Sequence, residues 1–596
     1  MKRKILAGLI AATAIEGVYA DGFSDTVFFG DSLTDSGYFK PLLQQAGMGG
    51  GAFTTNPDAT WAQWLADSYG HSAIPNGNGQ NGSNYAVGGA RVATAVTNNS
   101  LGVAVDVPSV AAQVNRYLTE RGGRADADAL YSVWGGANDL LAAAETPATA
   151  ALTLGSAASQ QAAAVKQLAD AGARYILVSN LPDVGLTPMA AATGTQAQST
   201  AAAQGYNTLL YGNLRASGVK VIPLDMFTLL QQVGADPQHY GFGNFSQTAC
   251  TVTSSLLCTR DTLQESGAEN SYFFADGIHP TGGAHKVIAQ YAQSVLDAPA
   301  KMGQVGSTAL AAGGLNRASV DRRLQQPAAE GIHWWAEAQG SDAPQNEGVN
   351  GNIRPGLTLG VERSGGVHRS GLYLHRADRK YDWQSGGGFK LKQTGFGAYH
   401  RYGQNSWWLN AQAGYDRIEA ETDRAVALGA ATHRHQAKAA GHLFGAAFKG
   451  GRQWQQGKLG YGPVAGLSYE RLLLGALAEN NRQSATAMRF EKQTPTSFKA
   501  SVGMQADYAL TPAWRVFGSA AYERELKKQR RDMTASLFTV PLDGFSLPAA
   551  ENKRNSLSLD IGAAFDTGRI SLNGGISHRR GNAEGTGMFV GVSSRF

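Results

Sequence analysis

The spacing of apolar residues changes near residue 330, and this change limits the possible folds more than any other feature. Up to residue 300, short continuous apolar runs are separated by alanine-rich segments. From residue 332 onward, apolar and polar residues alternate over stretches of about ten residues. A continuous run predicts a strand covered on both faces, whereas alternation predicts a strand whose faces meet different surroundings. The chain is therefore expected to form two domains of unlike architecture.

The N-terminal segment predicts export. Three basic residues at 2–4 precede an apolar stretch from Ile5 to Ile15, which is shorter than the roughly 20 residues of a transmembrane helix. Small residues follow and end at Ala20, as expected at a signal peptidase site. Residues 1–20 are therefore predicted to be a secretory signal peptide.

The first half has the pattern of an α/β domain over residues 21–300. Buried strands are predicted at 25–30, 131–136, 173–182 and 219–226, and helices at 149–172 and 200–217. This alternation predicts a parallel sheet with flanking helices. Functional residues in such sheets lie just past the carboxyl ends of the strands.

The second half, residues 331–596, has the pattern of a transmembrane β-barrel. Residues 498–508 carry Phe, Ala, Val, Met, Ala and Tyr on one face and polar or small residues on the other. Further candidate strands are 333–340, 356–363, 370–376, 395–402, 407–415, 441–449, 460–469, 514–523, 557–565, 570–578 and 588–596. A soluble β-sandwich gives similar alternation. The final segment, which ends on Phe596, resembles the last strand of bacterial outer-membrane barrels and favours the barrel.

The charge balance also separates the two halves. Residues 21–300 hold 11 Lys and Arg against 21 Asp and Glu, whereas residues 301–596 hold 37 against 24. A sign change of this size indicates two domains in different surroundings. Nucleic acid is not an expected partner of the basic half, because the chain is predicted to be exported and basic surfaces suit phosphate-bearing lipid.

The two cysteines, Cys250 and Cys258, both lie in the acidic half. Export makes a disulfide between them the expected state. Their spacing matches no zinc motif and no redox motif, so neither a metal site nor a nucleophilic cysteine is predicted.

Four short motifs in the acidic half could carry chemistry. Ser32, in Gly-Asp-Ser-Leu, follows the first predicted strand, and Asn138 follows the second. Taken singly, such residues are more often helix caps or turn residues. Asp276 lies three residues before His279, a spacing that lets the carboxylate accept from Nδ1 and leaves Nε2 free as a base. The fourth motif, Asn-Tyr-Ala-Val-Gly-Gly-Ala at 84–90, allows close approach of the backbone to a ligand.

Together the four motifs resemble the GDSL (SGNH) hydrolase family, whose order they follow over residues 25–280. The resemblance implies that Ser32 is the nucleophile, His279 the general base and Asp276 the residue that orients the imidazole. It also implies an oxyanion hole formed by the Ser32 N–H, the Gly88 N–H and the Asn138 amide, with Gly89 as the alternative to Gly88. The reaction needs no metal or cofactor.

Three other polar residues near these motifs are expected to have structural roles. Asp31 and Asp35 are interpreted as caps and hydrogen-bond partners, because the triad already has its carboxylate. His285 follows the last motif closely and is expected to lie on the surface of a helix.

The whole chain resembles the autotransporter GDSL esterases of Gram-negative bacteria. The resemblance implies a barrel of twelve strands in the outer membrane and a passenger domain exposed at the cell surface. It implies that the linker at 301–330 runs as a helix through the lumen, although a flexible linker is the alternative. Expected partners are outer-membrane lipid and the outer-membrane barrel assembly machinery, and the protein is expected to be a monomer.

The predicted function is hydrolysis of carboxylic esters, as an esterase or lipase, through an acyl-Ser32 intermediate. A lysophospholipase or an acyltransferase acting on membrane lipids with the same triad is the alternative within the enzymes. A passenger that serves as an adhesin or scaffold is the alternative outside them, and a pore conflicts with a plugged lumen. The sequence does not indicate the acyl-chain length.

Overall fold

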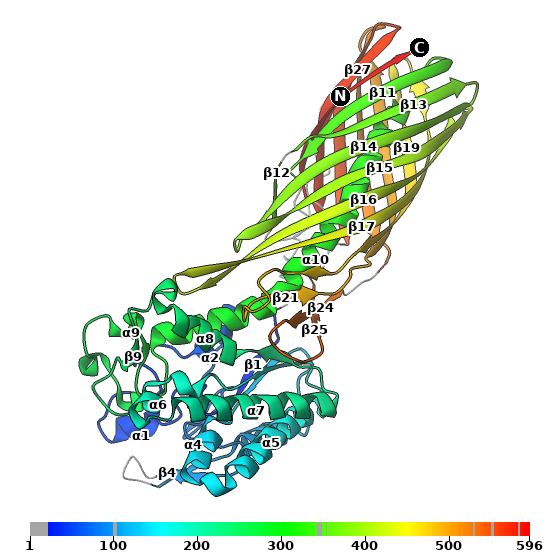
Figure 1. The fold of residues 1–596 in the computed structure, drawn as a ribbon. Helices are drawn as coiled ribbons and strands as arrows, with labels where there is room; N and C mark the ends of the chain where they lie inside the picture. The colour runs from blue at the N-terminus through cyan, green and yellow to red at the C-terminus, as the bar shows by residue number, and fades with distance from the viewer. Residues whose placement is uncertain are drawn as a thin grey trace.

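The computed structural model has two parts, an α/β domain and a long β-barrel, which one helix connects (Figure 1). It describes residues 22–98, 104–342, 349–352, 354–527, 531–549, 554–581 and 584–595. The predicted signal peptide at 1–20 and the final Phe596 lie outside the described residues.

The N-terminal domain is built on a four-stranded parallel sheet of order β1-β6-β7-β8. The strands are β1 (Thr26–Gly30), β6 (Leu130–Trp134), β7 (Tyr175–Ser179) and β8 (Ile222–Leu224). Every residue of these strands is buried, as expected for continuous apolar runs. The predicted parallel sheet is confirmed. Each strand overlaps a predicted run, and β6 begins one residue before its run.

Helices surround this sheet. They are α1 (Lys40–Gln45), α2 (Trp61–Ser68), α3 (Val110–Glu120), α4 (Ala137–Glu145), α5 (Ala150–Asp170), α6 (Pro188–Thr193), α7 (Gln196–Ser217), α8 (Met226–Ala235) and α9 (Ala268–Ser271). The alanine-rich helices α5 and α7 pack against each other. Short strand pairs complete the domain: β2 (Asn76–Gly77) with β3 (Gln80–Asn81), β4 (Val96–Asn98) with β5 (Val105–Val107), and β9 (Asn244–Thr248) with β10 (Tyr272–Phe274).

The connecting helix α10 (Gly282–Gln325) has 44 residues. It begins inside the α/β domain, where the Thr281 hydroxyl caps its first turn, and continues into the barrel (Figure 1). The helix therefore passes through the predicted boundary at residue 300 without a break. No helix in the part of the chain that the structure describes is both long enough and apolar enough to cross a bilayer.

The C-terminal part is a closed barrel, with twelve long strands among the described residues. They are β11 (Gly331–Ser341), β13 (Gly356–Gly365), β14 (His368–Trp383), β15 (Gly387–Gln404), β16 (Trp407–Leu428), β17 (Ala431–Arg452), β19 (Leu459–Leu474), β22 (Thr496–Ala509), β23 (Trp514–Glu525), β26 (Asn555–Asp566), β27 (Ile570–Gly581) and β28 (Gly585–Arg595). Neighbouring strands are antiparallel, and β11 closes the barrel by pairing with β28. The short strands β12 (Val349–Asn352) and β18 (Trp454–Gln456) pair with β14 and β19. The prediction of a barrel is confirmed.

The barrel wall has an apolar outer face and a polar inner face. On β13, Leu359 and Val361 are about half exposed, whereas the flanking residues Thr358 and Glu362 are buried. This alternation follows the pleat of the strand. In the lumen, basic residues of α10 pair with acidic residues of the wall: Arg317 with Glu470, Arg322 with Glu337, and Arg323 with Glu362.

A small sheet that the sequence did not indicate joins the two parts. It consists of β20 (Leu477–Ala478), β21 (Met488–Phe490), β24 (Asp532–Leu537) and β25 (Phe545–Pro548), and it lies between the barrel and the α/β domain (Figure 1). One hydrophobic cluster extends from Val27 of β1 to Ala549 beyond β25. The Tyr291 hydroxyl of α10 also donates to the Ala485 carbonyl, 3.2 Å away. The α/β domain is therefore packed onto the barrel as well as tethered to it.

Candidate active site

Three segments meet at the carboxyl end of β1. Gly30, the last residue of β1, pairs in register with Trp134 of β6, so the turns that carry Ser32 and Asn138 are adjacent. The N–H groups of Tyr85 and Val87 donate to the carbonyls of Phe28 and Gly30, at 2.8 and 3.2 Å. Residues 85–87 therefore lie along the edge of β1. The two glycines that follow, Gly88 and Gly89, come near the turn that carries Ser32.

Ser32, His279 and Asp276 form one chain of hydrogen bonds. His279 Nε2 lies 2.8 Å from Ser32 Oγ, although 247 positions separate the two residues. His279 Nδ1 lies 2.9 and 2.8 Å from the two oxygens of Asp276. Ser32 is 8% exposed, which leaves an opening to solvent at an otherwise buried position. With Nδ1 protonated, Nε2 can accept the serine proton.

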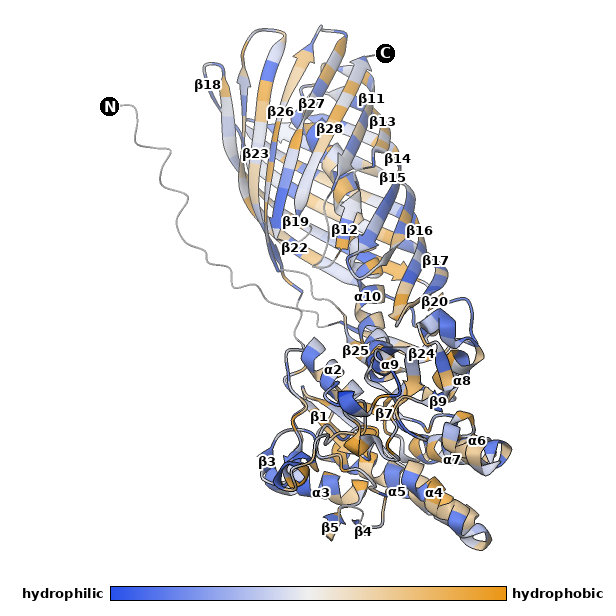
Figure 2. Cartoon of the chain, turned by 90° about the vertical axis from the view of Figure 1, so that its left-hand side faces the viewer, coloured by the Kyte–Doolittle hydropathy of each residue, from blue (hydrophilic) through white to orange (hydrophobic). Residues whose placement is uncertain are grey.

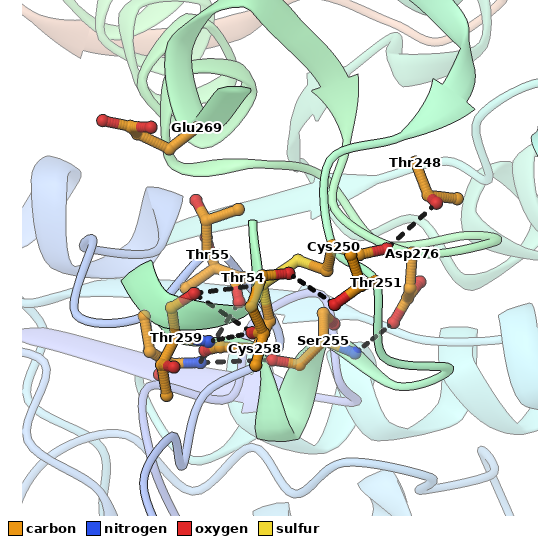
Figure 3. The surroundings of a disulfide bond; sticks show 12 residues. Thr54, Thr55, Thr248, Cys250, Thr251, Ser255, Cys258, Thr259, Glu269 and Asp276 are labelled. Atoms are coloured by element: carbon orange, nitrogen blue, oxygen red, sulfur yellow. Dashed lines mark hydrogen bonds between the residues drawn. A yellow bond between two sulfur atoms is a disulfide. The ribbon is translucent and has the colours of Figure 1, made fainter. Parts of the chain in front are cut away.

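Asp276 is held by backbone donors from two segments. Its Oδ1 accepts from the N–H groups of Ile278 and His279, at 3.0 and 2.8 Å. Its Oδ2 accepts from the Ser255 N–H at 2.6 Å (Figure 3). Burial raises the pKa of Asp276, but the charge of His279 and the hydrogen bonds outweigh burial and lower that pKa far below its usual range. The carboxylate is therefore ionised at neutral pH and stabilises a positive imidazolium.

The two adjacent glycines of the oxyanion motif differ in geometry. The Gly88 N–H donates to Asp35 Oδ2 at 2.9 Å and is therefore already engaged. Gly89 has a φ of +83° and open space where a Cβ would lie. Among the described residues, no acceptor takes the Gly89 N–H. The expectation that Gly88 supplies the oxyanion donor does not fit this geometry, because its hydrogen points to Asp35.

Asn138 and Asp139 hold the C-terminal end of the loop that carries Gly88 and Gly89. Asn138 Nδ2 donates to the Ala90 carbonyl at 3.0 Å, and the amide carries a second hydrogen that could serve a ligand. Asp139 accepts from the Val92 N–H at 2.8 Å and pairs with Arg91 at 3.1 Å. The glycine loop is thus anchored at both ends, which preorganises its free N–H.

Asp31 and Asp35 are buried carboxyl groups close to Ser32 in the sequence. Asp31 Oδ1 accepts from the Leu33 N–H at 3.1 Å, and Asp35 Oδ1 accepts from the N–H groups of Gly37 and Tyr38 at 2.8 and 2.7 Å. Burial raises the pKa of Asp31 to about 7 and that of Asp35 to about 6. Through these hydrogen bonds, both carboxyl groups hold the turn that carries Ser32.

His285 does not lie on the surface as expected. It is fully buried on α10, and its Nδ1 accepts from the Trp61 N–H at 3.2 Å. Burial lowers its pKa to about 3, so the imidazole is neutral. The prediction was wrong because this face of α10 packs against α2. The ring of Phe53, which the sequence did not single out, lies 4.9 Å from that of His279.

The two cysteines form a disulfide near the triad (Figure 3). The loop that it closes carries Ser255, the donor to Asp276. Within the described ranges, no group of three or more His, Cys, Asp or Glu side chains is arranged to hold a metal ion.

Comparison with known proteins identifies both domains. Residues 26–292 match the model of the GDSL-like Lipase/Acylhydrolase family, and residues 334–577 match that of the Autotransporter beta-domain. The chain thus combines a GDSL-like hydrolase region with an autotransporter beta-domain. The GDSL domain is accordingly an ester hydrolase of the esterase/lipase class, and the barrel is an outer-membrane domain. The predicted family is confirmed.

Several known proteins are similar to this chain over most of their length. Esterase EstA of Pseudomonas aeruginosa is 27% identical, over 94% of this chain and 93% of its own. Lipase 1 of Photorhabdus luminescens is 24% identical, over 85% of this chain and 86% of its own. Among solved structures, the translocator domain of the autotransporter NalP from Neisseria meningitidis is 20% identical with a TM-score of 0.40, and the match covers 49% of this chain and 99% of that domain.

Proposed function

We propose that this GDSL hydrolase cleaves carboxylic esters by two-step acyl transfer, with Ser32 as nucleophile, His279 as general base and Asp276 as the orienting carboxylate. The observation that carries the proposal is the unbroken hydrogen-bonded path from Ser32 Oγ through both nitrogens of His279 to Asp276. A serine hydroxyl becomes a competent nucleophile only when a neighbouring base takes its proton.

In the first step, Ser32 Oγ attacks the ester carbonyl carbon while His279 Nε2 accepts the hydroxyl proton. The tetrahedral oxyanion receives hydrogen bonds from the N–H groups of Ser32 and Gly89 and from the Asn138 amide. As the intermediate collapses, the imidazolium gives its proton to the leaving alkoxide, and the alcohol departs. In the second step, water loses a proton to His279, attacks the acyl-Ser32 carbonyl and releases the acid, while His279 returns a proton to Ser32.

We infer further that the hydrolase domain is displayed at the cell surface and acts on ester or lipid substrates there. The resemblance to autotransporters supports this location, as does a barrel that carries the hydrolase beyond one of its ends. We propose that the chain is inserted by the outer-membrane barrel assembly machinery and functions as a monomer.

Replacement of the nucleophile tests the mechanism. Ser32→Ala is expected to lower kcat for a short nitrophenyl ester by at least about 10³-fold, because no other group on the path can attack the carbonyl. The matched control is Ser36→Ala in the same turn, whose hydroxyl donates to the Ala73 carbonyl and not to the triad. Ser36→Ala should keep most of the activity, and heat-modifiable migration should show a folded barrel in both variants. Activity retained by Ser32→Ala would overturn the proposal.

The oxyanion assignment has its own test. Asn138→Ala is expected to lower kcat by roughly 10²–10³-fold with little change in KM, because the lost donor acts mainly in the transition state. A rise in KM of that size with unchanged kcat would mean that Asn138 binds substrate and does not stabilise the oxyanion. Products formed in the presence of an added alcohol would reveal acyltransfer to acceptors other than water.

A further inference from the structure

Asp276 receives backbone N–H groups of two kinds. Ile278 and His279 belong to its own turn and move with it. Ser255 belongs to another segment, 21 residues earlier, and its N–H reaches the opposite carboxylate oxygen, Oδ2. That oxygen is also the one 2.8 Å from His279 Nδ1. The Ser255 N–H is therefore the backbone donor, within the described hydrogen bonds, that fixes this oxygen relative to the rest of the domain.

The disulfide determines where Ser255 lies. Ser255 begins the short 3₁₀ turn Ser255–Leu257 inside the loop between Cys250 and Cys258. At one end of the loop, the Cys250 N–H donates to the carbonyl of Ala275, the residue before Asp276, at 2.9 Å. At the other end, Asn56 Nδ2 donates to the carbonyls of Ser255 and Cys258, at 3.1 and 3.0 Å. Figure 3 shows the disulfide beside the Ser255–Asp276 contact.

The loop is also held at Leu256, whose carbonyl accepts from the Gly51 N–H at 2.9 Å and whose side chain is buried in the main hydrophobic cluster. Cys250, Cys258 and Ala275 form a small buried cluster of their own, against which Val252 and Leu263 pack. The sulfur atoms are the centre of this cluster, and their bond is the covalent link that closes the loop carrying Ser255. A covalent link that closes a short loop restricts the conformations open to every residue within it.

We propose that the Cys250–Cys258 disulfide positions the catalytic carboxylate: it holds the Ser255 N–H against Asp276 Oδ2, and the hydrolase reaches its full rate only when this bond has formed. The inference rests on the proposed triad. Ser255 acts through Asp276 and is a positioning residue. An enzyme assembled in this way becomes fully active after export, where disulfides form and persist.

Proline at position 255 removes the donor. Ser254 is extended, with φ −124° and ψ 127°, and Ser255 is the first residue of its turn, so both positions are compatible with a proline at 255. The Ser255 hydroxyl has no hydrogen-bond partner among the described residues, so losing it breaks no contact there. Ser255→Ala keeps the N–H and is the matched variant. We expect kcat of Ser255→Pro to be about 10²-fold below that of Ser255→Ala, with similar KM, because Asp276 must turn away from His279.

Removal of the disulfide gives the second measurement. Cys250→Ala/Cys258→Ala is expected to lower kcat about tenfold at unchanged KM, at temperatures where circular dichroism shows the hydrolase folded. A variant that was only less stable would instead recover full kcat on cooling. Equal kcat for Ser255→Pro and Ser255→Ala, or wild-type kcat without the disulfide, would overturn the inference. Ser32→Ala, assayed in parallel, separates this outcome from failure of the triad itself, since only the latter leaves Ser32→Ala active.

Discussion

The hydrolase domain places its apolar strand residues in a buried core, whereas the barrel places them on its outer surface. In β1, all five residues are buried, and the sheet is the centre of its domain. In β22, Val502 and Met504 are 60% and 48% exposed, whereas the residues between and beside them face the lumen. Figure 2 shows polar and apolar residues alternating along the barrel strands. The same side chains therefore form a core in one domain and a lipid-facing surface in the other, and the period of the pattern distinguishes the two cases.

The polar residues show the reverse arrangement. The interior of the barrel holds ion pairs between α10 and the wall, such as Arg322 with Glu337, beside a small buried apolar cluster that includes Val320 and Leu324. In the hydrolase domain, buried carboxyl groups gather at the end of β1, where Asp31, Asp35 and Asp276 surround Ser32. Buried ion pairs thus hold the helix in one domain, and buried carboxyl groups surround Ser32 in the other.

The largest effect is expected from the hydrolase core. Phe29 of β1 is fully buried, and its ring lies 5.6 Å from those of both Tyr85 and Tyr117. Phe29→Ala should lower the free energy of unfolding of this domain by about 3–5 kcal/mol, because it removes transfer energy and leaves a cavity. Urea-induced loss of ester hydrolysis measures this. The control Leu152→Ala, at a side chain 75% exposed on α5, should change it by less than about 0.5 kcal/mol.

A second effect depends on pH. The pKa of Asp31 is raised to about 7 from 3.8, so the folded domain binds this proton more tightly than the unfolded chain does. The resulting stabilisation is complete below about pH 4 and is lost as pH rises to about 7, with an upper limit on the order of 4 kcal/mol. Asp31→Asn should flatten this dependence. The pH dependence of stability that remains in Asp31→Asn comes from Asp35, whose pKa of about 6 gives a smaller slope.

Urea unfolding followed by circular dichroism at several pH values measures this effect. The exposed Asp67 is the control position, and Asp67→Asn should keep the wild-type slope. An unchanged slope in Asp31→Asn would show that its carboxyl group is solvated in the folded protein, contrary to its burial in the structure.

The barrel provides a paired test on adjacent residues of one strand. Met504 faces outward from β22 and is 48% exposed, whereas Gln505 lines a cavity in the lumen that several charged side chains surround. Met504→Lys should cost about 2–4 kcal/mol of folding free energy in lipid, because it moves a charge into the hydrocarbon region. Gln505→Lys should cost much less, since its head group meets the charged lumen. Reversible folding into lipid vesicles compares the two, and equal costs would contradict the assignment of the faces.

Local pattern was sufficient to predict much of this molecule. Each of the four strands of the sheet and each of the twelve long strands of the barrel overlaps a predicted segment, because burial on one face or two leaves its period in the sequence. The chief error in the barrel concerned length. Strands β14 to β17 have 16 to 22 residues and extend toward the hydrolase beyond the alternating segments.

The motifs likewise singled out Ser32, Asp276 and His279, which the structure brings into hydrogen-bond contact. The role of Asn138 stays a prediction. The direction of a single N–H was not predictable in this way. Gly88 and Gly89 are adjacent and identical in sequence terms, and only the position of Asp35 shows which of them is engaged.

What the sequence determined by itself is therefore what depends on neighbours along the chain: strand period, turn residues and the spacing of the motifs. The tertiary structure decided everything that depends on contacts between distant segments. It buried His285 against α2, joined the two domains through the small sheet, and brought Ser255 to Asp276 through the disulfide loop. Such contacts leave no periodic trace, because each is set by how whole elements pack and not by the residues on either side.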